Sequence, residues 1–593
     1  MSTAIVTGSP VPGSSLEGDL RALGFDVRLA QDPAAAEEAL AAVPGEQRVA
    51  VVDAGFVGHV HALRLGLTDP RFPASAIPGA VTAQPAARQA LTRAVARTGV
   101  DPDVVAKSLE ADGTDVHHPE LGELVAAVPA DPQARNEARQ ALASVDDEAI
   151  RLRTAVKARD GFFTTYCISP YSRYIARWCA RRGLTPNQVT TASLLVAVIA
   201  AACAATGTRG GFVAAGVLLL ASFVLDCTDG QLARYSLQYS TMGAWLDATF
   251  DRAKEYAYYA GLALGAANAS GDDVWALALG AMVLQTGRHV IDFSFNEANH
   301  DAEALGKLAG ASPTASLSGK LDSVGWTVWA RRMIVLPIGE RWALIALFTA
   351  LTTPRITFYM LLIGCALAAC YTTAGRVLRS LTRRARRTDR AAAALGDLAD
   401  SGPIAEVVAK AVKAKAAPVV AAVGAVAVVA VSALTDFGSV WPIVAAAVYC
   451  VTSGLAVSRP LKGALDWLVP PIFRAGEYLT ILVLAARADV QGALPAAFGL
   501  VAAVAYHHYD TVYRIRGNAG APPHWLVRTI GGHEGRTLVV TVLAALLTPT
   551  DFATALTVFA VAVALVVLAE SIRFWVASAQ RGEPAVHDEG EPA

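Results

Sequence analysis

Four aspartates stand at the end of one apolar run and at the start of the next. They occur in two strings separated by eight residues: Asp226-Cys-Thr-Asp229-Gly230-Gln-Leu-Ala233-Arg234 and Gly243-Ala-Trp-Leu-Asp247-Ala-Thr-Phe-Asp251. If both strings are helical, residues three, four or seven apart share one helix face. Each string then presents its two carboxylates on one face. The short connection lets the helices fold back as an antiparallel pair with those faces together.

Such a carboxylate cluster indicates metal chemistry. Carboxylates at the ends of membrane helices are costly unless something neutralises their charge. Oxygen-rich sites suit hard divalent cations, and four carboxylates suit two metal ions. Gly230, Ala233 and Gly243 remove side-chain bulk where a large ligand would approach the backbone. The alternative is that the four aspartates only cap helix ends at the membrane interface.

The composition excludes several classes of protein. Of 593 residues, 54% are hydrophobic and 17% are charged, whereas soluble proteins carry about 25% charged residues. The mean hydropathy is +0.41. A disordered chain, a collagen-like repeat and an ordinary cytosolic enzyme are excluded, and an integral membrane protein with a soluble part is expected. The net charge of −1 gives no basic field for nucleic acid, so no nucleic-acid partner is expected.

Twelve apolar runs predict a multi-pass α-helical membrane protein, since a span takes about 20 residues. With both termini inside, the outside loops carry only Arg355 and Arg487, while the inside loops carry many Lys and Arg. This asymmetry predicts cytoplasmic termini in a bacterial-type plasma (inner) membrane. The runs lie near 187–206, 211–228, 245–267, 273–295, 342–353, 355–376, 418–434, 440–457, 465–486, 493–513, 536–549 and 552–573.

The chain divides into five regions. Short apolar strands near 5–7, 27–29 and 49–53 alternate with helical stretches, which predicts a small Rossmann-like α/β cytosolic domain with parallel strands. A further helix is expected around 132–157. The regions are the α/β domain at 1–125, a linker with juxtamembrane amphipathic helices at 126–184, a membrane domain at 185–378, a basic cytosolic linker at 379–417 and a six-helix membrane domain at 418–593.

The aspartate strings carry a resemblance. The pattern Asp226-x2-Asp229-Gly230-x2-Ala233-Arg234-x8-Gly243-x3-Asp247-x3-Asp251 resembles the full signature of the CDP-alcohol phosphatidyltransferase (phosphotransferase) family. The resemblance extends over about 155–385 and includes Pro186-Asn187, Thr190 and the basic amphipathic segment 171–182. Within the family, Lys157-x2-Asp160-Gly161 and Ser169-Pro-Tyr-Ser172-Arg173 resemble fused inositol-phosphate cytidylyltransferase/phosphotransferase proteins.

The resemblance implies an enzyme that forms CMP. An acceptor hydroxyl would attack the β-phosphorus of a CDP-alcohol (CDP-diacylglycerol or a CDP-polyol), as in phospholipid or inositol-phosphate-type biosynthesis. Two Mg²⁺ or Mn²⁺ ions would be held by Asp226, Asp229, Asp247 and Asp251, and Asp251 would act as general base. The residues expected to line the CDP-alcohol site are Gly230, Ala233, Arg234 and Gly243.

Three arginines are candidates for an acceptor's phosphate. Arg288, Arg332 and Arg341 lie near the inside ends of predicted spans four and five, on the side of the aspartates. In relatives that use a phosphorylated polyol, arginines in comparable places bind that phosphate. Positive-inside anchoring explains them equally simply. Lys254 and Glu255, one turn beyond Asp251, could touch the site or only solvate a helix end.

The N-terminal domain occupies the position of the cytidylyltransferase half of the fused enzymes. A loop from Gly8 to Gly13 follows the first strand and could cradle a phosphate, and Asp53 ends a strand where such enzymes hold a metal. The loop lacks the Lys or Arg of a nucleotidyltransferase fingerprint, so the domain is interpreted as degenerate and catalysis there is not expected. His59 and His61 are interpreted as surface histidines.

Residues 418–593 resemble a decayed second copy of the catalytic unit. The run 244–256 aligns without a gap with 466–478, and 227–233, 329–334 and 341–354 align in the same order with 450–456, 525–530 and 536–549. The copy would replace a partner subunit in an internal pseudo-dimer, although a homodimer or an unrelated six-helix bundle is also compatible. The four metal positions would become Tyr449, Thr452, Val469 and Phe473, which cannot hold two metals.

Two other classes of function remain open. A chain of six plus six spans could be a secondary transporter, although transporter sites tend to lie near the midplane of the membrane. A non-catalytic membrane scaffold could instead use the arginines of 376–417 to bind anionic lipid. Release of CMP from a CDP-alcohol separates an enzyme from both.

Overall fold

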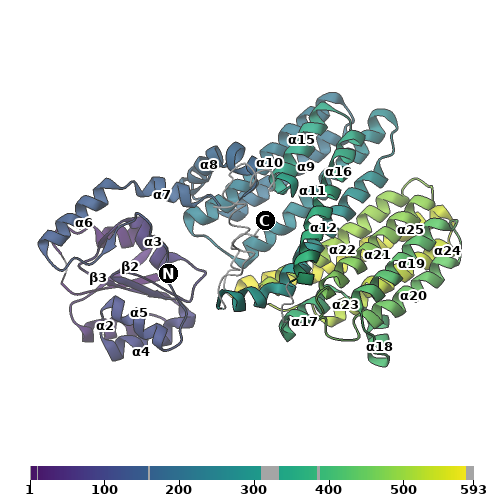
Figure 1. Cartoon of the computed structure of the whole chain (residues 1–593). Coiled ribbons are helices and arrows are strands. Elements are labelled where there is room, and N and C mark those ends of the chain that lie inside the picture. Colours follow the sequence, from purple (N-terminus) through teal and green to yellow (C-terminus); the bar gives the residue numbers. More distant parts are fainter. Residues whose placement is uncertain are drawn as a thin grey trace.

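The computed structural model of the chain describes residues 2–9, 11–157, 160–308, 333–382, 387–517 and 519–581. Three parts follow one another in space as they do in the sequence (Figure 1): an α/β domain, a first group of long helices drawn in teal, and a second group drawn in green to yellow. These groups are called the first and the second helical unit below.

The N-terminal domain is built on a six-stranded sheet with the order β2-β1-β3-β6-β5-β7. The predicted strands form β1 (Ser2–Thr7), β2 (Phe25–Ala30) and β3 (Arg48–Asp53), and β1 pairs in parallel with both neighbours. Short β7 (Val116–His117) pairs in parallel with β5 at the far edge. A separate two-stranded sheet joins β4 (Val57–Gly58) to β8 (Ala126–Ala127).

A hairpin makes the main sheet mixed, whereas the sequence predicted parallel strands. The strands β5 (Ala74–Ile77) and β6 (Ala80–Ala83) pair with each other, and β6 runs antiparallel to β3. Each strand has only four residues, which is too short for a clear alternation of apolar and polar residues. The turn Pro78-Gly79, in which Gly79 has φ 77°, was the available signal.

Helices cover both faces of the sheet. Figure 1 shows α2 (Pro33–Ala41), α4 (Arg88–Thr98) and α5 (Pro102–Ala111) on one face and α3 (Val60–Thr68) on the other, where α1 (Leu16–Ala22) also packs. Each face has its own core of buried apolar side chains. The helix expected around 132–157 is two helices, α6 (Pro132–Ser144) and α7 (Asp147–Thr154), because Asp146 caps a new helix start.

The interpretation of His59 and His61 as surface residues was wrong. Both are buried, at 6% and 4% exposure. His59 Nδ1 accepts a hydrogen bond from the Val125 N–H at 2.9 Å, so its Nε2–H donates to the Leu142 carbonyl at 3.2 Å. Neither ring nitrogen of His61 has a hydrogen-bond partner in the described structure. His59 therefore connects α6 to the rest of the domain through Leu142, and His61 is part of the core.

In the residues that the structure describes, the first helical unit has six long helices and one amphipathic helix. The amphipathic helix, α8, leaves Tyr171, Tyr174 and Trp178 about half exposed, as a helix along a membrane surface would. A capping box of Thr185 and Gln188 starts α9. The helices are α8 (Ser169–Arg181), α9 (Pro186–Ala205), α10 (Arg209–Ser236), α11 (Thr241–Ser270), α12 (Trp275–Leu308), α15 (Ile338–Leu351) and α16 (Pro354–Thr382).

The second helical unit repeats this number of long helices. Two short helices, α17 and α18, precede it within the region expected to be a basic linker, and they pack against it through buried Leu395 and Ala405. The elements are α17 (Asp389–Leu398), α18 (Pro403–Ala411), α19 (Ala417–Leu434), α20 (Trp441–Ala456), α21 (Val469–Arg487), α22 (Ala493–Arg516), α23 (His524–Ile530), α24 (Gly532–Leu546) and α25 (Pro549–Arg581).

The helices of the two units have the same order of neighbours. In the first unit α9 packs on α10 and α11, α10 packs on α15 and α8, and α12 packs on α16. In the second unit α19 packs on α20 and α21, α20 packs on α24 and α18, and α22 packs on α25. Between the units, α11 and α12 contact α21, α22 and α25, and the rings of Trp245 and Trp575 stack at 5.8 Å.

Six helices in the described part of the chain are long and apolar enough to cross a membrane. The other six expected spans also fold as helices at the expected places, but they are shorter or carry more polar residues. Several apolar helices thus indicate a membrane protein, while the count of twelve spans stays a prediction. The six helices are α9, α10, α16, α19, the helix Asp466–Arg487 and Pro549–Ser578.

Candidate active site

The two predicted aspartate strings form the facing ends of α10 and α11. Helix α10 stops at Leu237, which takes a left-handed conformation with φ 52°. Three residues later Ser240 caps α11 by accepting a hydrogen bond from the Gly243 N–H at 2.9 Å. This tight connection reverses the chain, so the helix ends that carry the carboxylates meet.

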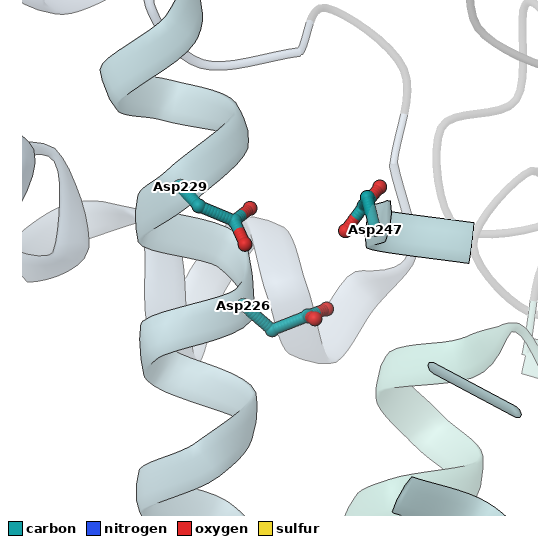
Figure 2. Close-up of side chains that lie close together, drawn as sticks. All are labelled: Asp226, Asp229 and Asp247. Atoms are coloured by element: carbon teal, nitrogen blue, oxygen red, sulfur yellow. The ribbon is translucent and has the colours of Figure 1, made fainter. Parts of the chain in front are cut away.

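Three of the four aspartates converge. One carboxylate oxygen from each of Asp226, Asp229 and Asp247 lies within 4.8 Å of the other two. Figure 2 shows Asp226 and Asp229 projecting from one helix toward Asp247 on the other side of the same space. Asp229 is 4% exposed, and its Oδ2 has no hydrogen-bond partner in the described structure. A buried carboxylate oxygen without a donor is costly, and a hard divalent cation would satisfy all three groups.

The fourth aspartate is joined to the cluster by a lysine. Lys254 has a fully buried side chain on α11, one turn after Asp251. Its ammonium pairs with Asp251 Oδ1 at 2.9 Å, contacts Asp226 Oδ1, and donates to Ser193 Oγ at 3.1 Å. The sequence was equally compatible with a Lys254 that only solvates a helix end, and that interpretation was wrong because the side chain is buried. The i, i+3 spacing from Asp251 was the signal that could have placed it on the carboxylate face.

The residues expected to line the CDP-alcohol site lie beside the carboxylates on the same two helix ends. A Cβ on Gly230 would first meet the Arg234 guanidinium at 3.5 Å, an ordinary contact. A Cβ on Gly243 would lie 2.9 Å from Asn187 Oδ1, so Gly243 permits close packing within the chain itself. Ala233 is half-buried on α10.

Arg234 connects this region to the N-terminal part of the chain. Its Nε–H donates to the Ala155 carbonyl at 2.6 Å, just after α7. Arg151 of α7 stacks on the ring of Tyr235 at 3.5 Å, and Arg71 of the α/β domain lies 4.1 Å from the ring centre of Tyr239. The N-terminal part of the chain therefore contacts the end of α10 and, through Arg71, Tyr239 of the loop that follows it.

Arg341 lies in a buried ion-pair network one turn from Asp251. Glu255 accepts from Arg252 Nη1 at 2.8 Å and pairs with Arg341 Nε at 3.1 Å. Arg341 and Glu255 are 2% and 3% exposed. This burial contradicts the reading of Arg341 as an interface anchor and of Glu255 as a solvated residue.

Arg288 lies on the same side of the unit. It is 7% exposed and donates to the Val335 carbonyl at 2.6 Å. His289 follows Arg288 on α12, and its Nε2 lies 2.7 Å from Gln285 Nε2. Arg332, the third candidate for the acceptor's phosphate, lies outside the described residues.

A residue of the second helical unit contacts both His289 and Arg252. Tyr509 of α22 is hydrogen-bonded to His289 Nδ1 at 2.5 Å, and its ring lies 5.3 Å from the Arg252 guanidinium. No sequence signal marked Tyr509, because it reaches the site only through the packing of α22 against α12.

The aligned positions in the second unit form an apolar and aromatic cluster. Tyr449 donates to the Phe473 carbonyl at 3.0 Å, and Phe473 stacks on His533 with 4.1 Å between ring centres. Val469 is fully buried, and Thr452 bonds only to its own helix. None of these four positions carries a carboxylate, and the absence of a metal pair from this unit stays a prediction.

The N-terminal domain brings its two candidate residues to one sheet edge. Thr7 and Asp53 are paired in the parallel ladder of β1 and β3, so the loop after β1 starts beside Asp53. Asp53 Oδ1 accepts from the Gly55 N–H at 2.6 Å, and Arg135 of α6 contacts the Gly55 carbonyl. A basic residue is thus present near this edge, although it comes from α6 and not from the loop.

Comparison with protein families agrees with this site: residues 183–370 match the family described as CDP-alcohol phosphatidyltransferase. Residues 389–593, which contain the second helical unit, match a family of unknown function (DUF5941).

Individual relatives resemble shorter stretches. The bifunctional IPC transferase and DIPP synthase of Aquifex aeolicus is 32% identical over 114 residues, 19% of this chain and 26% of the relative. That of Rubrobacter xylanophilus is 34% identical over 172 residues, 26% of this chain and 38% of the relative. The archaetidylinositol phosphate synthase of Pyrococcus horikoshii is 34% identical over 91 residues, 15% of this chain and 47% of the relative. The chain thus spans less than half the length of each.

Proposed function

We propose that this chain transfers a phospho-alcohol group from a CDP-alcohol to an acceptor hydroxyl and releases CMP, with Mg²⁺ or Mn²⁺ as cofactor. The observation that carries the proposal is the meeting of Asp226, Asp229 and Asp247 within 4.8 Å at the facing ends of α10 and α11. Together with Asp251 they form the donor set for two ions. Bound there, the ions would neutralise the diphosphate and polarise its phosphorus.

The chain's own residues have separate parts in the reaction. Asp251 is proposed to take the proton of the acceptor hydroxyl, whose oxygen then bonds to the β-phosphorus. The bond from that phosphorus to the bridging oxygen breaks, and the electron pair leaves with CMP. Gly230, Ala233, Arg234 and Gly243 border the nucleotide. The buried ammonium of Lys254 holds Asp226 and Asp251 in place.

The acceptor is proposed to carry a phosphate. Arg252 and Arg341 both pair with the carboxylate of Glu255, and the buried Arg288 donates to the Val335 carbonyl. A buried excess of positive charge suits an anionic group. The relatives are named as an archaetidylinositol phosphate synthase and as bifunctional IPC transferases and DIPP synthases, so a phosphorylated polyol is the acceptor class to test first. Arg332 would join this group.

The second helical unit is proposed to be a non-catalytic repeat of the first, in one twelve-span protein. Three observations support this: the equal number and neighbour order of long helices, the gapless alignment of 244–256 with 466–478, and the absence of carboxylates at Tyr449, Thr452, Val469 and Phe473. The unit then acts as an internal partner through contacts such as Tyr509 with His289. The positive-inside asymmetry supports cytoplasmic termini in a plasma membrane.

The alternatives are a secondary transporter and a lipid-binding scaffold. Against both stands the buried Asp229 oxygen without a donor at a helix end, which neither function requires. Of the arginines proposed to bind lipid, Arg376 pairs with Asp292 and Arg387 contacts the Gly463 carbonyl, so these two already have partners within the chain. Arg383, Arg384 and Arg386 lie outside the described residues.

The experiment measures CMP. Purified full-length protein is incubated with cytidine-labelled CDP-diacylglycerol or a CDP-polyol, Mg²⁺ and a set of polyol phosphates and free polyols. We expect CMP to form only with both substrates and metal present, and to disappear in Asp251→Asn. Asp436→Asn, an exposed aspartate in a loop, is the matched control. No CMP with any acceptor would refute the proposal, whereas accumulation of a solute in vesicles would favour the transporter.

A further inference from the structure

Asp400 occupies an unusual place between two buried arginines of the second helical unit. It follows α17 in a left-handed conformation, φ 53°, and is 4% exposed. Its Oδ2 lies 3.0 Å from Arg474 Nη2 and 2.8 Å from Arg536 Nη2, and its Oδ1 lies 3.1 Å from His507 Nε2. Burial would raise the pKa of Asp400, but Arg474, Arg536 and His507 hold it well below its usual value. The group is an anion at neutral pH.

The two arginines belong to a network with a close counterpart in the first unit. Glu477 Oε2 lies 3.0 Å from Arg474 Nη1, and Glu477 Oε1 lies 2.5 Å from Arg536 Nε. In the first unit the same atoms of Glu255 meet the same atoms of Arg252 and Arg341, at 2.8 and 3.1 Å. The cationic network is therefore present in both units, although the metal-binding carboxylates are present in only one.

The two networks differ in their anions. In the second unit, Arg474 and Arg536 are balanced by Glu477 and Asp400. In the first unit, Glu255 is the carboxylate that the described structure pairs with Arg252 and Arg341. In the second unit the additional negative charge is the carboxylate of Asp400. In the first unit it is proposed to come from the phosphate of a substrate.

The segment around Asp400 is fitted tightly into the second unit. A Cβ on Gly402 would lie 2.3 Å from the Gly531 carbonyl oxygen, and one on Gly532 would lie 2.2 Å from the Gly402 nitrogen. Glu534 accepts from the N–H groups of Gly402 and Ala405 at 3.0 and 3.1 Å. The position of the backbone therefore fixes the carboxylate of Asp400 beside the two arginines.

The pocket retains polar atoms that the chain does not satisfy. Arg474 Nε, Arg536 Nη1, His507 Nδ1 and His533 Nε2 are buried without hydrogen-bond partners in the described structure, and all four side chains are at most 2% exposed. A cavity of about 230 Å³, lined by Pro403, Gly531 and Arg536 among others, borders the cluster. The unpartnered N–H groups of Arg474 and Arg536 suit a tetrahedral oxyanion, which accepts more hydrogen bonds than one carboxylate.

We propose that the second helical unit contains an anion-binding pocket between Arg474 and Arg536, in which Asp400 stands in for a phosphate-type oxyanion. Removing the carboxylate opens the pocket to inorganic phosphate or sulfate. If the second unit is a repeat of the first, as proposed above, this pocket corresponds to a substrate site of the first unit. The binding of an oxyanion does not depend on that relationship.

The test replaces the internal anion with an external one. Glycine accepts the left-handed backbone, so Asp400→Gly removes the carboxylate without strain and leaves room for an ion. Asp489 is the matched control because it has a similar φ of 46° but is exposed. Thermal unfolding of the purified full-length protein is followed in detergent while sulfate or phosphate is titrated from 0 to 100 mM. Sodium chloride at equal ionic strength accompanies each point.

We expect Asp400→Gly to lower the unfolding temperature by about 10 °C, since an unpaired buried charge is strongly destabilising. Sulfate or phosphate should restore much of the loss along a saturable curve. The wild type, Asp489→Gly and the chloride series should show no saturable rise. A linear rise shared by all variants, or a loss that no oxyanion restores, would overturn the proposal.

A second variant covers the case in which Asp400→Gly does not fold. Asp400→Ala also removes the carboxylate and leaves room for an ion, and it should gain the same oxyanion dependence. If neither variant folds in plain buffer, both are expressed and purified with 100 mM sulfate, and failure to recover either then counts against the pocket. This experiment measures the unfolding temperature. If the wild type forms no CMP, the proposed function is refuted, but the oxyanion dependence of the Asp400 variants is not affected.

Discussion

The buried ammonium of Lys254 contacts the carboxylate of Asp226, although the two residues lie on different helices. The same ammonium pairs with Asp251 at 2.9 Å, so one cation links the two aspartate strings. A buried carboxylate cluster needs such a partner, because uncompensated charges in a region of low dielectric are costly. Lys254 therefore stabilises the arrangement of carboxylates to which the metal ions are proposed to bind.

Removal of a single carboxylate should abolish metal-dependent turnover. For Asp226→Ala we expect CMP release to fall by about 100-fold or more, because metal affinity depends on the complete donor set. Excess chelator should have the same effect on the wild type, and added Mg²⁺ should reverse it there but not in the variant. Asp436→Ala, an exposed aspartate, serves as control. Full turnover of Asp226→Ala would contradict the proposed role.

Removal of the lysine should make stability depend more on metal. Without the Lys254 ammonium, Asp226 and Asp251 repel each other unless a divalent cation is bound. In Lys254→Met we expect the unfolding temperature to differ between excess chelator and 10 mM Mg²⁺ by several degrees more than in the wild type. Lys413→Met, at an exposed lysine of the second unit, should behave as wild type. Equal shifts in all three proteins would count against the ion pairing.

The convergence of the aspartates was predictable, but the groups around them were only partly so. Helical periodicity alone places Asp226 with Asp229 and Asp247 with Asp251, because each pair lies three or four residues apart on a membrane helix. Lys254 follows the same spacing rule and could have been assigned. Tyr509 and Asp400 could not, since each reaches its site through packing between segments more than 70 residues apart.

Local sequence signals also explain the errors in the fold. The β5–β6 hairpin has strands of four residues, which carry too little pattern to identify. The helices α17 and α18 lie in a region whose basic flanks suggested a linker, yet Leu395 and Ala405 are buried. His59 and His61 could not be assigned to the core, because burial of a histidine depends on partners such as Val125 and Leu142 that are distant in sequence.

His61 predicts a pH dependence in the N-terminal domain. Burial, together with Arg151, Arg64 and His59, lowers its pKa to about 4, whereas an unfolded histidine titrates near 6.5. Below pH 6.5 the unfolded chain binds a proton that the folded domain does not. The stabilisation is therefore complete above about pH 6.5 and declines toward pH 4, by on the order of 2–3 kcal/mol.

Hydrogen exchange of the full-length protein measures this effect. Amides of β1 and β3 should exchange faster at pH 4.5 than at pH 7, after correction for the intrinsic rates. His61→Phe should remove most of that difference, and His118→Phe should leave it unchanged because His118 is largely exposed. A difference that persists in His61→Phe would assign the dependence to other groups.

Single cysteines test the proposed topology. In a background with Cys167→Ser and Cys370→Ser, which removes the two exposed cysteines, an impermeant maleimide is applied to intact cells. Arg390→Cys should stay unlabelled, because the loop charges place that segment in the cytoplasm. Asp436→Cys, in the loop on the opposite side, should be labelled. Labelling of position 390 before lysis, or protection of 436, would reverse the orientation.

The contact of Tyr509 with His289 and Arg252 predicts that the second helical unit tunes the site of the first. In Tyr509→Phe, His289 Nδ1 loses its partner at 2.5 Å, and Arg252 is held less firmly. If Arg252 and Arg341 bind an acceptor's phosphate, KM for that acceptor should rise by about 10-fold, which corresponds to one charge-assisted hydrogen bond of about 1.4 kcal/mol, while kcat changes little. Tyr449→Phe is the control, because its hydroxyl donates to the Phe473 carbonyl within the second unit. A rise in KM for the CDP-alcohol instead, or equal effects of both variants, would show that Tyr509 acts only on folding.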